Sequence, residues 1–102
     1  MNEQYTARAA EILSGMTPEE KAGQLFLAHF PANDVEGLIR EYHPGGFVLF
    51  ARDFEHKSPE ELKADIQRYN EAANLPLIIS ADEEGGSVVR ISKFPQYSSC
   101  IN

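Results

Sequence analysis

Two kinds of hydrophobic pattern follow one another along the chain. Apolar residues three or four positions apart, as on one face of a helix, recur within residues 5–13, 35–42 and 62–73. Short, nearly continuous apolar runs occupy residues 24–30, 47–50 and 77–79. A strand packed between two layers of helices is apolar on both faces, so these runs indicate strands that are buried on both sides. The chain is therefore predicted to alternate helices with buried strands.

The same four-residue capping motif predicts the start of two helices. It occurs as Thr17-Pro18-Glu19-Glu20 and as Ser58-Pro59-Glu60-Glu61. In each, a hydroxyl caps the helix, proline takes the first helical position, and a glutamate can reach back to the cap. Predicted helix stops are Gly15, Pro44-Gly45-Gly46 and Asn74, the last in a left-handed conformation. The two copies of this motif are two separate helix starts and do not indicate a repeated unit of sequence.

The order of elements predicts a parallel sheet, because crossovers of this length form right-handed βαβ units. After the third strand, Gly85-Gly86 predicts a tight turn, since glycine reaches positive φ without steric cost. Three strands leave two unpaired edges. The residues alone therefore fit either a small open α/β domain or the opening segment of a (β/α)₈ barrel, which takes about 250 residues.

Composition narrows the function classes. The 102 residues are 42% hydrophobic and 25% charged, as is usual for a globular domain. The net charge of -7 opposes binding to nucleic acid and to anionic membranes. No apolar run approaches the roughly 20 residues that cross a bilayer, and residues 1–15 lack the apolar core of a signal peptide. The single Cys100 fits a reducing compartment, so a cytoplasmic location is expected.

Asp82 is the first candidate for contact with a ligand, because it lies where the third predicted strand ends. Ligands of α/β proteins bind at the carboxyl ends of the strands, and a carboxylate accepts hydrogen bonds from two hydroxyl groups at once. The bland interpretation is that Asp82 caps a turn. Glu83 and Glu84 do not form a catalytic pair, because neighbours on an extended chain point to opposite faces. Glu84 either holds the glycine turn, pairs with Arg90 or adds a weaker ligand contact.

The three histidines, His29, His43 and His56, lack metal-ligand spacing, and there is no second cysteine to help them. Neither a metal nor a cofactor is expected. His43 belongs to a helix stop on the side of the sheet opposite the chemistry. His29, near the end of the first strand, has two interpretations. It either lines the mouth of a pocket or is a packed or solvent-bonded histidine, which is the commoner case.

Three segments together resemble the amino-terminal portion of glycoside hydrolase family 3, and most closely its β-N-acetylhexosaminidase-like branch. They are residues 16–26 (MTPEEKAGQLF), 45–52 (GGFVLFAR) and 81–90 (ADEEGGSVVR). Their order and separation also fit the family. The resemblance covers residues 16–95 and leaves 96–102 as an irregular tail, so residues 1–102 are interpreted as a partial barrel domain.

The resemblance implies the first three or so βα units of a (β/α)₈ barrel, preceded by an amino-terminal helix. The family removes β-linked sugars with retention, through a covalent glycosyl-enzyme. Its nucleophile, an aspartate on a late strand, and its histidine acid/base, in a Lys-His-x-Pro-Gly-His-Gly loop, lie beyond the end of this chain. No catalytic residue is therefore expected here, and whether the chain alone is an enzyme stays open.

What the resemblance does carry over is substrate binding. Asp82 matches the family's aspartate at the end of the third strand, which is expected to bind sugar hydroxyls. Arg90 matches the second arginine of a Glu-Gly-Gly-Arg-Val-x-Arg pattern, whereas Ser87 replaces the first. Any contact made by that first arginine is missing here.

Two function hypotheses follow. In the first, the chain is a fragment of a retaining glycosidase for β-linked N-acetylglucosamine or a related β-sugar, and supplies part of the pocket without the nucleophile or acid/base. In the second, it is a small non-catalytic α/β module that binds sugar or protein, or that forms a homo-oligomer through its sheet edges.

Overall fold

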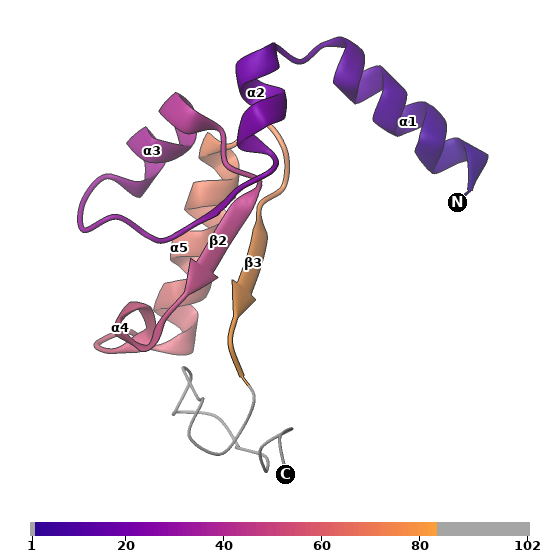
Figure 1. Ribbon diagram of the computed structural model, residues 1–102. Coiled ribbons are helices and arrows are strands. Elements are labelled where there is room, and N and C mark those ends of the chain that lie inside the picture. The colour runs from indigo at the N-terminus through magenta and orange to yellow at the C-terminus, as the bar shows by residue number, and fades with distance from the viewer. Residues whose placement is uncertain (1, 84–102) are drawn as a thin grey trace, which may run out of the picture.

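The computed structural model describes residues 2–83 and contains a three-stranded parallel sheet in the order β1-β2-β3 (Figure 1). The strands are β1 (Leu27–Ala28), β2 (Gly46–Leu49) and β3 (Ile78–Ala81). In the register of the sheet, Gly46 lies between Leu27 and Ile78, so β2 is the central strand. The predicted α/β class and the parallel βαβαβ order are confirmed.

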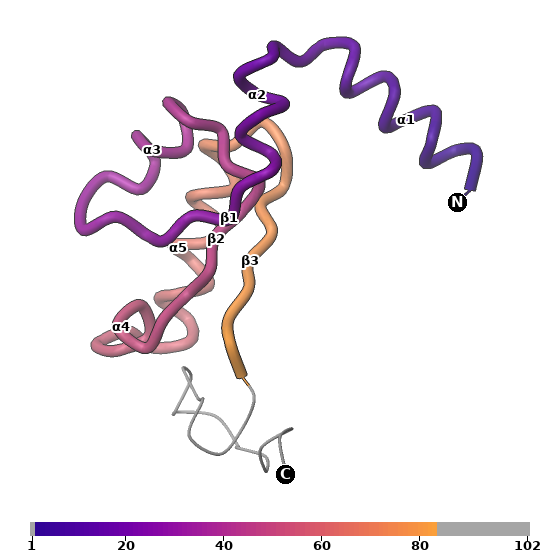
Figure 2. Tube along the Cα trace, viewed as in Figure 1, coloured from indigo at the N-terminus to yellow at the C-terminus, as the bar shows by residue number. Residues whose placement is uncertain are grey.

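Helices α3 and α5 cover one face of this sheet, and α1 extends away from it (Figures 1 and 2). The helices are α1 (Glu3–Ser14), α2 (Pro18–Gly23), α3 (Val35–Tyr42), α4 (Ala51–Phe54) and α5 (Pro59–Ala72). Within residues 2–83, none of them is long and apolar enough to cross a membrane. The predicted glycine turn at 85–86, Glu84, Arg90 and the tail at 96–102 lie outside the described residues.

The predicted helix starts are present. The Thr17 hydroxyl accepts the amide of Glu20 at 3.1 Å, and the Glu20 carboxylate accepts the amide of Thr17 at 3.4 Å. The Ser58 hydroxyl accepts the amide of Glu61 at 3.1 Å in the same way. Each bond satisfies an amide that has no partner within the helix, which is why these sequences start helices.

The predicted left-handed stop at Asn74 is wrong. The non-glycine residues with positive φ in the described region are Asp34, His43 and His56. Helix α5 ends at Ala73 in an extended conformation, with ψ of 149°. The chain then turns into β3, and the Asn70 side chain accepts the amide of Leu77 at 2.8 Å. That side-chain bond closes the turn without a left-handed residue.

The hydrophobic core lies between the sheet and the helices α3 and α5. Phe47 and Leu49, alternate residues of β2, point into it, together with Phe30, Val35, Ile39 and Tyr69. The Phe30 ring lies 4.9 Å from that of Phe47 and 5.3 Å from that of Tyr69, measured between centroids. Aromatic rings attract each other at these distances. The cluster therefore holds β2, α5 and the segment after β1 together.

On the other face of the sheet, called the open face below, no helix of residues 2–83 packs. Leu27, Gly46 and Ile78 share it, and Ile78 is 62% exposed. The prediction that the first and third strands are buried on both sides is therefore wrong. The first is also shorter than residues 24–30, with Leu25 84% and Phe26 65% exposed. The reason is geometric, because the described helices pack on one face only.

An ion-pair network ties α5 to its surroundings. The Asp65 carboxylate accepts hydrogen bonds from Lys57, in the loop before α5, and from Arg68 at 3.1 Å. Arg68 also pairs with Glu36 of α3 at 2.6 Å. Partial burial opposes ionisation of Asp65, but the bonds from the two cations outweigh it, so its pKa lies below its ordinary value.

We expect Ile39→Ala to lower the free energy of unfolding by about 2–5 kcal/mol, because Ile39 is 1% exposed and its removal leaves a cavity. Ile78→Ala is the matched control and should cost about 1 kcal/mol or less, since it removes an exposed side chain. Urea unfolding measures both. Equal losses would contradict a core confined to the helix-covered face.

Asp65→Asn should destabilise the protein at neutral pH but not in acid. A carboxyl whose folded pKa is depressed adds stability above its unfolded pKa of about 3.9, and that stability is lost as the pH falls through the folded pKa. The gap between variant and parent should therefore hold from pH 7 to about 5 and shrink below about 4. Thermal melts at several pH values measure it, with exposed Glu71→Gln on the same helix as control. A gap independent of pH would contradict the ion-pair explanation.

Candidate functional site

The carboxyl ends of the three strands form one rim of the sheet. His29, Phe50 and Asp82 stand there, each one residue beyond its strand. Because the strands are parallel, these three positions lie toward the same edge, with Phe50 and Asp82 level and His29 two residues short of them in the register. This is the edge at which α/β proteins bind ligands.

Register and alternation place the three side chains on the open face. Val48 pairs with Ser80, and both belong to the set that includes Gly46 and Ile78. Two residues further along each strand come Phe50 and Asp82, on the same face. On β1, Ala28 packs against the core and Phe30 lies within it, so His29 between them points the other way.

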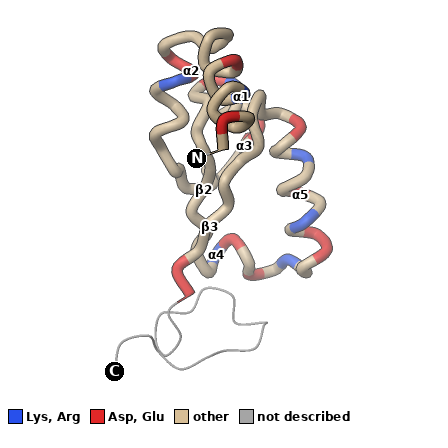
Figure 3. Tube along the Cα trace, turned by 90° about the vertical axis from the view of Figure 1, so that its right-hand side faces the viewer, with Lys and Arg blue, Asp and Glu red and all other residues tan. Residues whose placement is uncertain are grey.

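Asp82 is exposed at the end of β3. Just before it, the Ser80 hydroxyl donates to the carbonyl of Phe47 at 3.1 Å and ties β3 to β2. Figure 3 shows acidic residues at the described end of β3. Of the three predicted binding residues, the structure thus locates Asp82 at the rim, whereas Glu84 and Arg90 lie outside the described residues.

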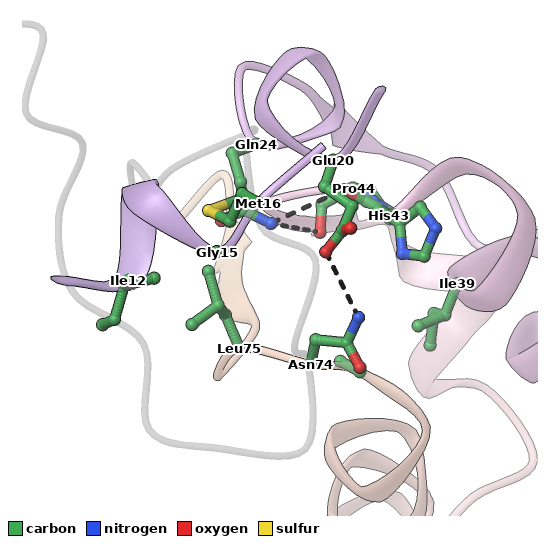
Figure 4. Close-up of a pocket in the computed structure, with 11 residues that line it drawn as sticks. Ile12, Gly15, Met16, Glu20, Gln24, Ile39, His43, Pro44, Asn74 and Leu75 are labelled. Atoms are coloured by element: carbon green, nitrogen blue, oxygen red, sulfur yellow. Dashed lines mark hydrogen bonds between the residues drawn. The ribbon is translucent and has the colours of Figure 1, made fainter. Parts of the chain in front are cut away.

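A more enclosed cavity lies at the opposite end of the sheet (Figure 4). It has a volume of about 190 Å³ and lies among α1, α2 and the loops that lead into β2 and β3. Its polar lining residues are Glu20, Gln24, His43 and Asn74. The cavity is therefore at the amino ends of the strands, away from Asp82.

The polar groups around this cavity are already engaged in holding the chain. The backbone amide and then the hydroxyl of Thr17 lower the pKa of Glu20, whose other oxygen accepts from Asn74 at 3.5 Å. The Gln24 amide donates to the carbonyl of His43 at 3.4 Å. His43 caps α3 in a left-handed conformation, and its own amide donates to the carbonyl of Ile39. The predicted structural role of the His43 loop is confirmed.

Phe50 is the rim residue that the sequence interpretation missed. It was assigned to a buried apolar run with Phe47, but its ring lies on the open face and meets the ring of His29 at 4.4 Å. The Asp53 carboxylate accepts the Phe50 amide at 2.7 Å and starts α4, a helix that was not predicted. The spacing from Phe47 to Phe50, an odd number of residues, is the signal that puts the two rings on opposite faces.

Residues 2–83 contain no group of three or more histidine, cysteine or acidic side chains that could hold a metal ion. What the rim offers is one exposed carboxylate beside two aromatic rings. A carboxylate that accepts hydrogen bonds, next to apolar surface, is suited to a neutral polyhydroxylated ligand.

The fold places the chain among the parallel α/β proteins, whose ligands bind at the carboxyl edge of the sheet. Comparison with known families gives a specific answer. The profile described as "Glycosyl hydrolase family 3 N terminal domain" matches residues 17–100. The chain belongs to this family, which confirms the resemblance seen in its three motifs.

The similar curated proteins all carry the name beta-hexosaminidase. A "Beta-hexosaminidase" of Methylobacillus flagellatus is 46% identical over 57 residues, which cover 54% of this chain and 16% of that protein. One of Tolumonas auensis is 44% identical over 53 residues, or 52% of this chain and 15% of that protein. One of Bordetella avium is 46% identical over 50 residues, or 47% and 14%. The matched segment thus spans about a sixth of the length of these curated relatives.

Proposed function

We propose that this chain forms the first βα units of a (β/α)₈ barrel in a retaining glycoside hydrolase that removes β-linked N-acetylglucosamine or a related β-sugar. The family match over residues 17–100 and the parallel order of the strands support this proposal. So does the name of the relatives, beta-hexosaminidase. In this proposal residues 1–102 are a partial barrel domain, and the protein works in the cytoplasm.

The observation that carries the proposal is the place of Asp82 within the family-matched segment. Asp82 is an exposed carboxylate at the carboxyl end of β3, on the face that no described helix covers. In a closed barrel the corresponding edge of the sheet holds the active site. Asp82 accepts hydrogen bonds from two sugar hydroxyls and fixes the ring's orientation, with weaker contacts from Arg90 and Glu84.

The chain supplies binding but not bond cleavage in this proposal. A retaining mechanism needs a nucleophile that attacks the anomeric carbon and an acid that protonates the leaving oxygen. The family resemblance assigns both groups to segments that follow residue 102. Asp82 and its neighbours position the sugar, and the catalytic groups come from the rest of the enzyme.

Asp82→Asn should weaken binding of N-acetylglucosamine by about tenfold or more, because hydrogen bonds to a charged group contribute about 1.5–3 kcal/mol. Titration of the 102-residue chain, followed by NMR, measures the affinity. Glu83→Gln is the matched control, since it removes the same charge one residue further on, where the side chain points to the other face.

Equal effects of Asp82→Asn and Glu83→Gln on the affinity would contradict a specific role for Asp82.

The 102-residue chain should also hydrolyse a chromogenic N-acetylglucosaminide no faster than buffer does. Turnover that Asp82→Ala abolishes would show that the catalytic groups are present after all.

A second candidate is a non-catalytic module that assembles through the free edge of β1. Within residues 2–83, β1 has a strand neighbour on one side only. A groove formed by α2, α3, β1 and the flanking loops has a mainly apolar lining, with two carboxylates from Glu19 and Glu41. Its apolar residues are Ala22, Phe26, Ala28, Leu38, Tyr42 and Pro44. An unpaired edge next to exposed apolar surface favours pairing with a second copy of the chain.

In this second candidate, Phe26→Lys should convert a dimer into a monomer, because it places a charge beside the pairing edge. Size-exclusion chromatography with light scattering measures the mass. Tyr5→Lys, on the exposed surface of α1, is the control and should leave the mass unchanged. A parent chain that stays monomeric at every concentration would rule this candidate out.

A further inference from the structure

Among residues 2–83, the hydrophobic core includes neither His29 nor Phe50, the aromatic pair at the rim. His29 is exposed, and Phe50 is only partly buried. Their ring centroids are 4.4 Å apart and the ring planes meet at 62°, an edge-to-face arrangement. Phe30, which follows His29, and Phe47, three residues before Phe50, belong to the core on the other face. The sheet therefore sends one set of rings into the interior and presents the other at the rim.

The backbone fixes the Phe50 ring in this position. Phe50 is extended, with φ of -110° and ψ of 171°, so it continues the alternation of β2. Its amide donates to the Asp53 carboxylate at 2.7 Å, and α4 begins at the next residue. The chain thus turns away immediately after Phe50 and leaves its ring at the end of the strand.

Register brings this ring next to Asp82. Leu49 pairs with Ala81, so Phe50 and Asp82 are the next residues of neighbouring parallel strands, which lie about 4.8 Å apart. His29 flanks Phe50 on the side of β1. The rim therefore carries, in strand order, an imidazole, a phenyl ring and a carboxylate, all on the open face.

A pyranose ring has hydroxyls around its edge and a face of C–H groups. The carboxylate of Asp82 suits the hydroxyls. The electron-rich face of an aromatic ring suits C–H groups, which carry a small positive charge. Binding sites for small molecules combine such apolar walls with a few polar groups that fix orientation. The row at the rim has both components side by side.

We propose that Phe50 forms the aromatic wall of the sugar-binding pocket, contacting the C–H face of the pyranose that Asp82 holds by its hydroxyls. His29 is a positioning residue, because its edge-to-face contact holds the Phe50 ring upright at the rim. This inference rests on the proposed function and extends it from one polar contact to a specificity for pyranose rings with an unobstructed C–H face.

The test uses the 102-residue chain and N-acetylglucosamine itself. Phe50→Leu keeps apolar bulk but removes the ring, and should weaken binding about threefold to tenfold. Phe50→Tyr keeps the ring and should bind within about twofold of the parent. His29→Leu should show a smaller loss than Phe50→Leu. Tyr5→Leu, an exposed aromatic residue on α1, is the control and should bind as the parent does.

A second readout reports the contact directly. Saturation of the protein's aromatic protons should transfer to the ring C–H protons of the bound sugar, and Phe50→Leu should reduce this transfer more than Tyr5→Leu does. Thermal melts of each variant separate loss of binding from loss of fold. A Phe50→Leu chain that melts at the same temperature as the parent but binds the sugar more weakly supports the proposed contact between Phe50 and the sugar.

The outcomes separate the inference from the proposed function. If binding depends on Asp82 but is unchanged in Phe50→Leu, the aromatic wall is wrong and the proposed function stands. If binding is lost in Phe50→Leu and kept in Asp82→Asn, the wall is supported and the role of Asp82 is overturned. If the parent chain does not bind the sugar at all, the proposed function fails, and this inference fails with it.

Discussion

The parallel pairing of β2 with both neighbours is the constraint on which the rest of the structure depends. This register sends Phe47 and Leu49 toward α3 and α5, and sends Gly46, Val48 and Phe50 to the opposite face. A shift by one residue would exchange the two sets and expose the core. This pairing of β2 with β3 requires glycine at position 46, because a Cβ there would lie 1.9 Å from the carbonyl oxygen of Ile78.

Within residues 2–83, the helices that contribute to the core pack on one side of the sheet, so its two faces differ. The covered face holds the core and supplies the hydrophobic stabilisation. The open face leaves Ile78 exposed and carries the rim residues His29, Phe50 and Asp82. The same asymmetry thus accounts for the exposed apolar surface and for the candidate site.

The two ends of the sheet also differ in what their polar groups do. At the amino ends, Glu20, Gln24 and His43 bond backbone groups at the ends of α2 and α3, so their hydrogen-bonding capacity serves the fold. At the carboxyl ends, Asp82 stays exposed. The chain belongs to a family of glycosyl hydrolases, and the function proposed for Asp82 uses the end of the sheet where polar groups are not engaged in capping α2 and α3.

The sequence by itself determined the family, the order of the strands and the starts of α2 and α5, because caps and hydrophobic periodicity act locally. Thr17, Ser58 and the apolar stripes of α3 and α5 predicted helices that the structure contains, and the motifs around Asp82 gave the family. Tertiary structure alone decided which side of each strand the helices cover. A continuous apolar run places apolar side chains on both faces of a strand, so the sequence does not distinguish the two faces. Tertiary structure therefore exposed Ile78 and brought the rings of His29 and Phe50 together from separate strands.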